Sequence, residues 1–373
     1  MSLVPRRRIA LAHEWLDARA GSEKAFEALA ALFPDADLFA LTDTLRDGFN
    51  SGGRAVATTA LSRVPGLQHR RDLALPFMPM AWRTATRRRY DLVITSSHAC
   101  VKGFGPGRSA LHLCYCYTPM RYVWDPHDRR SGLHRLAGLG PRALLRRWDH
   151  RSSGWVNSFA AISTAVQARI ERCYGRTSRV IHPPVDTEFY KPGEPGPIDP
   201  ALPVGPFVLT CSRFIPYKRL DLAILAAERI GLPVVVAGRG PGESALRALA
   251  DRVRVPVSFE VAPSDERLRD LYRAAAAFVF PALEDFGIVA VEAQACGTPV
   301  VALAEGGTAD TVVDGVTGAT VEVQDADSFA EGLQRALALD AGRACLANAE
   351  AFSVSRFGAR VRAWVEDAEQ GRC

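Results

Sequence analysis

The 373-residue sequence has no long apolar run and no cysteines at CxxC spacing. No segment approaches the roughly 20 apolar residues that a spanning helix needs, and the basic start of the chain is interrupted at His13 and Glu14, too early for a secretory signal. The eight cysteines include no CxxC pair and lie mostly within apolar segments, which is typical of buried reduced thiols. These absences argue against a membrane-spanning or disulfide-linked protein, and we expect a cytoplasmic location.

Nothing in the composition indicates disorder. Hydrophobic residues make up 48% of the chain and charged residues 23%, as in globular proteins with a substantial core. The length favours two domains. Residues 191–206, KPGEPGPIDPALPVGP, are rich in proline and glycine and are typical of a linker. We therefore predict a first domain over residues 1–187 and a second over residues 205–355.

Acidic residues are scarce in the first half of the chain. Through Arg179 there are 28 Lys and Arg against 14 Asp and Glu, and after it 18 against 27, so we expect an anionic partner for the first domain. No helix-turn-helix, zinc-finger or RNP-like motif accompanies the charge, which argues against nucleic acid. In residues 75–93, LPFMPMAWRTATRRRYDLV, the apolar and aromatic residues Phe77, Met78, Met80 and Trp82 precede four arginines, a mixture typical of peripheral contact with an anionic membrane. A solvated basic helix packed on its own domain is the alternative.

Predicted strands and helices alternate twice along the chain. The first series contains IALAHEW, a helix in GSEKAFEALAALF, and strands in DLFAL, DLVITS, LHLCYCY and FAAIS; the second runs from FVLTCS through LPVVVAG, VSFEV and AFVFP to TPVVA with helices between. This alternation predicts parallel sheets covered by helices. The expected fold is α/β, with two doubly wound domains facing a central cleft and a last helix, about 356–373, returning to the first domain.

Two acids interrupt an apolar stretch, PALEDFGIVAVEAQACGTPVVA, at residues 281–302. Predicted strands flank a helix here, so Glu284 and Glu292 lie near the carboxyl end of a strand, where open α/β sheets bind ligands. Helix N-termini at that edge favour anions, whereas carboxylates accept hydrogen bonds from hydroxyls. A ligand that carries both an anionic group and sugar hydroxyls satisfies both conditions. Stabilisation of acids by the helix dipole is the simpler alternative, and it suits Glu284 better than Glu292.

Two cations follow the first predicted strand of the second domain, in LTCSRFIPYKRLDLA. At this position the guanidinium of Arg213 and the ammonium of Lys218 can together neutralise a departing diphosphate. Loop cations are usually only solvated. Their combination with the two glutamates therefore carries the interpretation.

These motifs resemble a known enzyme family. SRFIPYKRLDLAI together with FPALEDFGIVAVEAQACGTPVVA is similar to the retaining glycosyltransferases of family 4, which have the GT-B fold, two Rossmann-like domains and an E-x7-E element. In the first domain TSSHACVKG, YCYTPMRYVWD, AISTAVQARIERCYG and VIHPPVD resemble the mannosyltransferase-like branch of bacterial surface-polysaccharide assembly. The resemblance covers nearly the whole chain and implies an acceptor domain followed by a nucleotide-sugar donor domain.

The resemblance implies roles for residues of the second domain. It assigns Glu284 to hydroxyls of the donor sugar, Glu292 to the nucleotide ribose, and Arg213 and Lys218 to the diphosphate. The further donor-binding residues that it implies are Phe286, Gly287 and Ile288 through their backbone N–H groups, and Gly238 and Val261 at strand ends that flank the base.

In the first domain the resemblance implies that Gly21 lets the backbone approach the β-phosphate and that His98 contacts the donor sugar near the reacting carbon. A hydrogen-bonded structural histidine is the alternative for His98. The family commonly has a Gly-Gly pair where this chain reads RAGSEK, and the related branch often has CHTPMR where this chain has Tyr117. The acceptor-side candidates are therefore Tyr117, Thr118 and Arg121.

The leading interpretation is a retaining hexosyltransferase that moves mannose from GDP-mannose to a lipid-linked saccharide, in cell-surface polysaccharide or glycolipid synthesis. The resemblance implies that the leaving phosphate accepts the acceptor's proton, with no cofactor and no metal. Asp35 to Asp37 and Asp325 to Asp327 match Asp-x-Asp, but they fall in expected turns where aspartate is common. A UDP-sugar transferase, a nucleotide-sugar epimerase and a nucleotide-sugar sensor are the alternatives.

Overall fold

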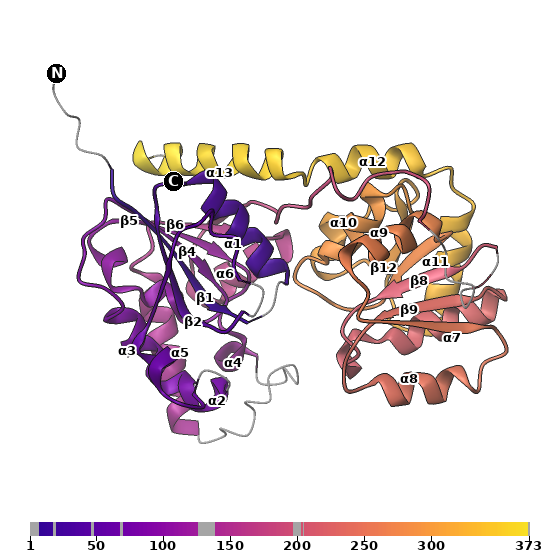
Figure 1. Cartoon of the computed structure of the whole chain (residues 1–373), viewed down its shortest axis with the longest axis horizontal. Coiled ribbons are helices and arrows are strands. Elements are labelled where there is room, and N and C mark those ends of the chain that lie inside the picture. Colours follow the sequence, from indigo (N-terminus) through magenta and orange to yellow (C-terminus); the bar gives the residue numbers. More distant parts are fainter. Residues whose placement is uncertain are drawn as a thin grey trace. The chain divides into compact units, whose positions relative to one another are not determined.

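A computed structural model describes residues 7–17, 20–45, 48–67, 70–125, 139–196, 203 and 205–371. The chain forms two compact units: Met1–Pro184 with Phe357–Cys373, called the N-terminal domain, and Val185–Arg356, called the C-terminal domain (Figure 1). The proline-rich segment expected to link two domains lies partly outside the described residues.

The N-terminal domain contains a seven-stranded sheet with the strand order β3-β2-β1-β4-β5-β6-β7, in which neighbouring strands are parallel. The strands are β1 (Ile9–Leu16), β2 (Asp37–Asp43), β3 (Val56–Thr58), β4 (Leu92–Ser97), β5 (Leu111–Cys116), β6 (Ser158–Ala161) and β7 (Ser178–Val180). The helices are α1 (Gly21–Leu32), α2 (Arg71–Ala74), α3 (Met78–Arg83), α4 (Arg121–Trp124), α5 (Leu139–Ser153) and α6 (Thr164–Tyr174).

The central strand β1 is buried on both faces, as expected for a sheet covered by helices on both sides. Ala10 and Ala12 belong to the apolar core that includes Trp82 of α3. The alternate residue His13 points to the other face, where its ring stacks on Phe26 of α1 with centroids 4.9 Å apart. The period of two along β1 thus divides the strand between two layers of helices.

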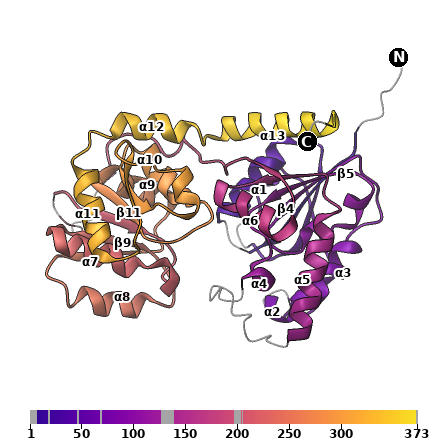
Figure 2. The same ribbon diagram turned by 180° about the vertical axis from the view of Figure 1, so that it is seen from behind.

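The last helix, α13 (Val354–Glu369), packs on the N-terminal domain and crosses over α1 (Figures 1 and 2). Gly358 lies so close to α1 that an added Cβ would be 3.0 Å from Cδ2 of Leu32. Trp364 is buried and donates its indole N–H to Oγ of Ser158 at 2.9 Å. The chain therefore returns to its first domain after completing the second.

The C-terminal domain contains a six-stranded parallel sheet with the order β10-β9-β8-β11-β12-β13. The strands are β8 (Val208–Cys211), β9 (Val234–Gly238), β10 (Val257–Val261), β11 (Ala277–Phe280), β12 (Val300–Leu303) and β13 (Gly318–Val321). The helices are α7 (Leu220–Ile230), α8 (Glu243–Ala250), α9 (Asp265–Ala274), α10 (Ile288–Ala295), α11 (Ala326–Leu337) and α12 (Gly342–Glu350). Helix α7 packs with α11 on one face, and α10 packs with α9 and α12 on the other (Figures 1 and 2).

The strand order reverses next to the first strand of each sheet, between β1 and β4 and between β8 and β11. Ligands of doubly wound domains bind outside the carboxyl ends of strands at such a reversal. His98 directly follows β4, Lys218 follows β8, and Glu284 follows β11. The predicted α/β fold with two Rossmann-like domains is confirmed, and the order of strands places these residues at the two reversal points.

The basic segment around α3 is divided between core and surface. Trp82 and Met78, which the sequence grouped with the surface-seeking residues, are buried in the domain core. Phe77 and Met80 are 58% and 60% exposed. Part of the apolar side of this segment therefore packs in the core of its own domain. Within the described ranges, no helix combines the length and the hydropathy required to cross a membrane.

His112 on β5 gives the N-terminal domain an expected dependence on pH. Burial lowers the pKa of His112 to about 4 from 6.5, so the folded domain keeps the ring neutral while the unfolded chain binds a proton below about pH 6.5. As pH falls from 6.5 to 4, the free energy of unfolding should therefore decrease by about 3 kcal/mol from this group. Urea unfolding of wild type and His112→Asn between pH 7 and 4.5 measures the difference. Parallel pH curves for the two proteins would contradict it.

Candidate functional site

The C-terminal domain brings together one cation and one acid that the sequence singled out. Lys218 ends a short 3-10 turn, Pro216–Lys218, after β8, and Glu284 lies in the loop between β11 and α10. Nζ of Lys218 is 2.7 Å from Oε1 of Glu284, and the two side chains are only 10% and 21% exposed. Because β8 and β11 are adjacent and parallel, residues 66 positions apart in sequence meet at one edge of the sheet.

Arg213 lies in the same loop as Lys218 but is exposed. Its Nη2 donates to the hydroxyl of Tyr217 at 3.1 Å, and the ring of Tyr217 lies 5.4 Å from Nζ of Lys218. Both cations therefore project from the loop after β8, with Lys218 inside the site and Arg213 toward solvent.

Glu292 lies on the inner side of α10 and is only 4% exposed. The hydroxyl of Tyr272 donates to its Oε2 at 3.4 Å. Burial, and then the charge of Glu292, raise the pKa of the Cys211 thiol to about 12. An acid so deeply buried in an apolar helix is expensive, and simple dipole stabilisation does not explain it.

The loop before α10 places backbone donors beside Glu284. Gly287 has φ 81°, in the left-handed region that glycine tolerates, and precedes Ile288, the first residue of α10. Phe286 is buried against Phe352, with ring centroids 5.8 Å apart. The packed Phe286 ring and the left-handed backbone of Gly287 together orient the N-terminus of α10, whose first N–H groups have no partner within the helix.

Two glycines after β12 support this loop, and sequence analysis missed them. The N–H of Gly307 donates to the carbonyl of Glu284 at 2.8 Å, and an added Cβ at Gly307 would lie 2.2 Å from Cα of Phe286. At Gly306 an added Cβ would lie 2.6 Å from the Glu284 carbonyl oxygen. The Glu-Gly-Gly triplet after the predicted strand TPVVA was the available signal.

The predicted base-flanking residues lie on neighbouring strand ends. Gly238 and Val261 are partners in the register of β9 and β10, and Val261 is exposed. Gly238 has φ 135°, and a Cβ there would lie 1.9 Å from the carbonyl oxygen of Ser212. Gly238 is thus required for close packing of the loop after β8, in addition to any contact with a ligand.

In the N-terminal domain His98 is half-buried at the end of β4, in a group of aromatic rings. The ring centroids of Trp15, His13 and Tyr117 lie 4.5, 5.9 and 6.1 Å from that of His98, each in an edge-on arrangement. These rings come from β1 and from the residue after β5. Three strand ends therefore orient the imidazole.

A chain of hydrogen bonds joins this group to the start of α1. Nδ1 of His13 lies 2.9 Å from Oγ of Ser96, Ser96 donates to the hydroxyl of Tyr117 at 2.9 Å, and Tyr117 donates to the carbonyl of Ser22 at 2.9 Å. Burial raises the pKa of Tyr117 well above its ordinary value. Tyr117 thus holds the turn that begins at Gly21, a role that sequence analysis did not anticipate.

Glu14 is a second residue whose role sequence analysis missed. It is fully buried, and its Oε1 accepts the backbone N–H groups of Ala99 and Val101 at 2.7 and 2.9 Å. Burial raises the pKa of Glu14, and the two backbone hydrogen bonds oppose that shift. Glu14 therefore fixes the turn after His98. The polar pair His-Glu at the end of an otherwise apolar strand was the signal.

The other acceptor-side candidates follow β5. Thr118 is buried, and its hydroxyl accepts a hydrogen bond from Nη1 of Arg169 at 2.7 Å. Arg121 is the first residue of α4 and is half-buried. Both lie at the carboxyl edge of the same sheet as His98.

The two Asp-x-Asp pairs have structural contacts. Asp37 accepts hydrogen bonds from the hydroxyl of Tyr90 at 2.6 Å and from Arg88 at 3.3 Å, and Asp325 caps α11 through the N–H of Ser328 at 2.8 Å. In the part of the chain that the structure describes, no three His, Cys, Asp or Glu side chains are grouped as metal ligands.

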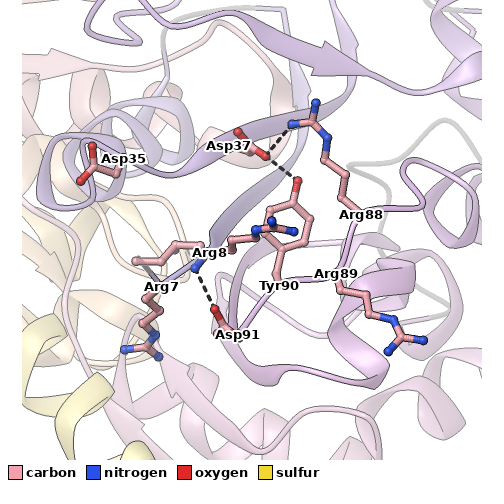
Figure 3. Close-up of a pocket in the computed structure, with 9 residues that line it drawn as sticks. Arg7, Arg8, Asp35, Asp37, Arg88, Arg89, Tyr90 and Asp91 are labelled. Atoms are coloured by element: carbon pink, nitrogen blue, oxygen red, sulfur yellow. Dashed lines mark hydrogen bonds and ion pairs between the residues drawn. The ribbon is translucent and has the colours of Figure 1, made fainter. Parts of the chain in front are cut away.

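A hollow in the surface of the N-terminal domain lies away from His98. It has a volume of about 870 Å3 and is formed at the amino ends of β1, β2 and β4 (Figure 3). Figure 3 shows Arg88 directed to Asp37, and the backbone N–H of Arg8 directed to Asp91. The hollow is therefore a surface groove of mixed charge at the edge opposite to the ligand-binding edge of the sheet, and we do not assign the site to it.

Solved structures with the same fold identify the class of protein. The chain is similar to Anabaena Alr3699/HepE, solved in complex with UDP-glucose, with a TM-score of 0.69, 18% identity and coverage of 97% of this chain and 100% of that chain. It is also similar to sucrose-phosphate synthase from Thermosynechococcus elongatus, with a TM-score of 0.74, 20% identity and coverage of 98% and 100%. Two Rossmann-like domains in this arrangement along the chain define the GT-B class.

Sequence comparison then gives the family. The family described as "Glycosyltransferase Family 4" matches residues 26–189, and "Glycosyl transferases group 1" matches residues 202–351. The chain belongs to the family 4 glycosyltransferases of GT-B fold.

Curated relatives include two D-inositol 3-phosphate glycosyltransferases. The protein from Mycobacterium sp. (strain JLS) is 40% identical over 190 residues, which cover 47% of this chain and 43% of that protein. The protein from Mycobacterium bovis (strain BCG / Pasteur 1173P2) is 39% identical over 176 residues, covering 44% and 36%. The match therefore spans less than half the length of these curated relatives.

Proposed function

We propose that this chain is a retaining, metal-independent hexosyltransferase that transfers mannose from GDP-mannose to a lipid-linked saccharide in cell-surface polysaccharide or glycolipid synthesis. The observation that carries the proposal is the Lys218–Glu284 pair, 2.7 Å apart at the reversal point of the C-terminal sheet. An ammonium suits a diphosphate and a carboxylate suits sugar hydroxyls, and a sugar diphosphate carries both kinds of group a few bonds apart. The family membership supports sugar transfer.

In this proposal, catalysis consists mainly of positioning and charge stabilisation. Lys218 and Arg213 stabilise the negative charge that develops on the leaving diphosphate, while the N–H groups of Gly287 and Ile288 bind the phosphates or sugar. Glu284 holds the sugar hydroxyls. The leaving phosphate accepts the proton of the attacking hydroxyl on the same face of the sugar, so that the anomeric configuration is retained.

The N-terminal domain would bind the acceptor, with His98 near the reacting carbon. Peripheral membrane contact belongs to the same proposal, because exposed Phe77 and Met80 precede Arg83 and three further arginines at residues 87–89. Apolar side chains beside several cations are the combination that binds anionic lipid surfaces.

A UDP-sugar donor is the second candidate. Anabaena Alr3699/HepE was solved in complex with UDP-glucose. The pneumococcal O-GlcNAc transferase GtfA, which is similar at 12% identity and a TM-score of 0.67 over 97% of this chain and 99% of that chain, was solved in complex with UDP and GlcNAc. The two candidates differ in the base of the donor, so a comparison of GDP-sugars with UDP-sugars distinguishes them.

A donor panel tests the function. Purified full-length protein is incubated with GDP-mannose, UDP-glucose and UDP-GlcNAc, with and without EDTA, and release of nucleoside diphosphate and transfer to a lipid-linked saccharide are measured. We expect GDP-mannose to be turned over at least about tenfold faster than either UDP-sugar. EDTA should not lower the rate of this turnover. Preferential turnover of a UDP-sugar would select the second candidate. An epimerised free sugar would indicate an epimerase, and tight binding without turnover would indicate a sensor.

A further inference from the structure

Lys218 and Glu284 form an ion pair with one another. The ammonium and the carboxylate are 2.7 Å apart and largely shielded from water, although the proposed function gives them different parts of the donor. We propose that Glu284 is a selectivity gate that weakens binding of a bare diphosphate relative to a sugar diphosphate. This inference rests on the proposed function for its ligand class but not on the identity of the base or the sugar.

The gate follows from competition for a single ammonium. A phosphate that binds Lys218 must share or displace Glu284, and then lies beside its negative charge. A bare diphosphate has a higher charge than a sugar diphosphate and brings no hydroxyl to that position, so the repulsion is not offset. An attached sugar places hydroxyl donors at the carboxylate, and these charge-assisted hydrogen bonds replace the lost ion pair.

Backbone hydrogen bonds hold in place the two loops that carry these side chains. The N–H of Lys218 donates to the carbonyl of Ile215 at 3.0 Å within its turn. On the other side, the carbonyl of Glu284 accepts the N–H of Gly307 at 2.8 Å, and the glycines after β12 leave no room for movement toward them. A phosphate at Lys218 therefore remains next to Glu284 rather than inducing the loop to withdraw.

The gate affects donor binding and product release differently. Before transfer, the intact donor satisfies both Lys218 and Glu284. After transfer, the sugar has left and only a nucleoside diphosphate remains, so Glu284 competes again for Lys218 and favours release. We expect weak inhibition by the nucleoside diphosphate product as a consequence.

Glu284→Gln tests the gate, since glutamine keeps the shape and one acceptor oxygen while removing the charge. Binding of inorganic pyrophosphate, GDP and GDP-mannose to the full-length protein is measured by calorimetry. We expect the Kd of pyrophosphate and of GDP to fall about tenfold and the Kd of GDP-mannose to rise about tenfold. The matched control is Glu322→Gln, an exposed acid directly after β13 at the same sheet edge, which should leave all three within about twofold.

A Lys218→Met background distinguishes competition from a general change in charge, because the gain in pyrophosphate affinity should vanish there. The gate is overturned if Glu284→Gln binds pyrophosphate no more tightly than wild type, if the gain persists without Lys218, or if neither protein binds pyrophosphate. Pyrophosphate carries no base and no sugar. A gain for pyrophosphate without binding of GDP-mannose or UDP-glucose would therefore refute the proposed donors while supporting the competition at Lys218.

Discussion

Replacing Lys218 by alanine is expected to lower kcat for sugar transfer by about 10²- to 10³-fold, with a much smaller change in the Kd of the donor. The reason is that the ammonium interacts most strongly with the charge that develops on the leaving diphosphate, and it does so in a largely water-excluded position. Single-turnover and steady-state assays with the preferred donor measure kcat, and calorimetry measures Kd.

Two variants make this prediction specific. Arg219→Ala removes the neighbouring cation, whose guanidinium pairs with Asp221 at 3.1 Å instead of with Glu284, and it should change kcat by less than about threefold. Glu292→Gln should raise the Kd of the donor about tenfold and affect kcat less. If Lys218→Ala and Glu292→Gln both produced the same mild effect on both constants, the roles assigned to these residues would be wrong.

Replacing Lys102 by methionine is expected to lower the free energy of unfolding of the N-terminal domain by about 3–5 kcal/mol. Lys102 forms an ion pair with Asp149 of α5, and the two side chains are 2% and 0% exposed. Burial lowers the pKa of Lys102, but its charge interaction and hydrogen bond with Asp149 raise it by more, so that it lies above its ordinary value. Without the lysine, the carboxylate remains buried, and among the described residues Trp124 and Tyr174 still donate to it, at 2.7 and 2.8 Å.

The double variant Lys102→Met/Asp149→Asn should be more stable than Lys102→Met alone, because it removes the uncompensated charge and keeps an acceptor for Trp124 and Tyr174. Arg88→Met is the surface control. Its guanidinium is mostly exposed and pairs with Asp37 at 3.3 Å, so its loss should cost about 1 kcal/mol or less. Urea denaturation followed by circular dichroism measures all three, and a loss below about 1 kcal/mol for Lys102→Met would refute the assigned role of the buried pair.

Much of the C-terminal site could be predicted because its signals are local. A buried strand, a helix with a glycine before it, and acids in an apolar stretch can be recognised within some 20 residues, and they placed Glu284 and Gly287 at a strand end. Lys218 was recognised by its position after a strand. That it meets Glu284 depends on β8 and β11 being neighbours, which the spacing along the chain does not specify.

The supporting residues were harder to predict because their reasons are long-range. In the sequence, Glu14 is a charged residue that interrupts an apolar strand. Its role becomes visible only in the fold, where the backbone N–H of Ala99, 85 residues away, donates to its carboxylate. In the sequence, Gly307 resembles an ordinary turn glycine. In the structure its backbone N–H donates to the carbonyl of Glu284. Trp82 was grouped with surface residues because it precedes arginines, yet the fold buries it.

The amino-acid sequence by itself determined the α/β class, the two parallel sheets and the family. The periodicity of hydrophobic residues, the positions of glycines and the short motifs that indicate them can all be recognised within short segments of the chain. Only the tertiary structure decided that a lysine and a glutamate form one pair, and which buried polar groups hold the catalytic loops. Such contacts form between strand ends that become neighbours through the order of strands in the sheet, and no local pattern encodes that order.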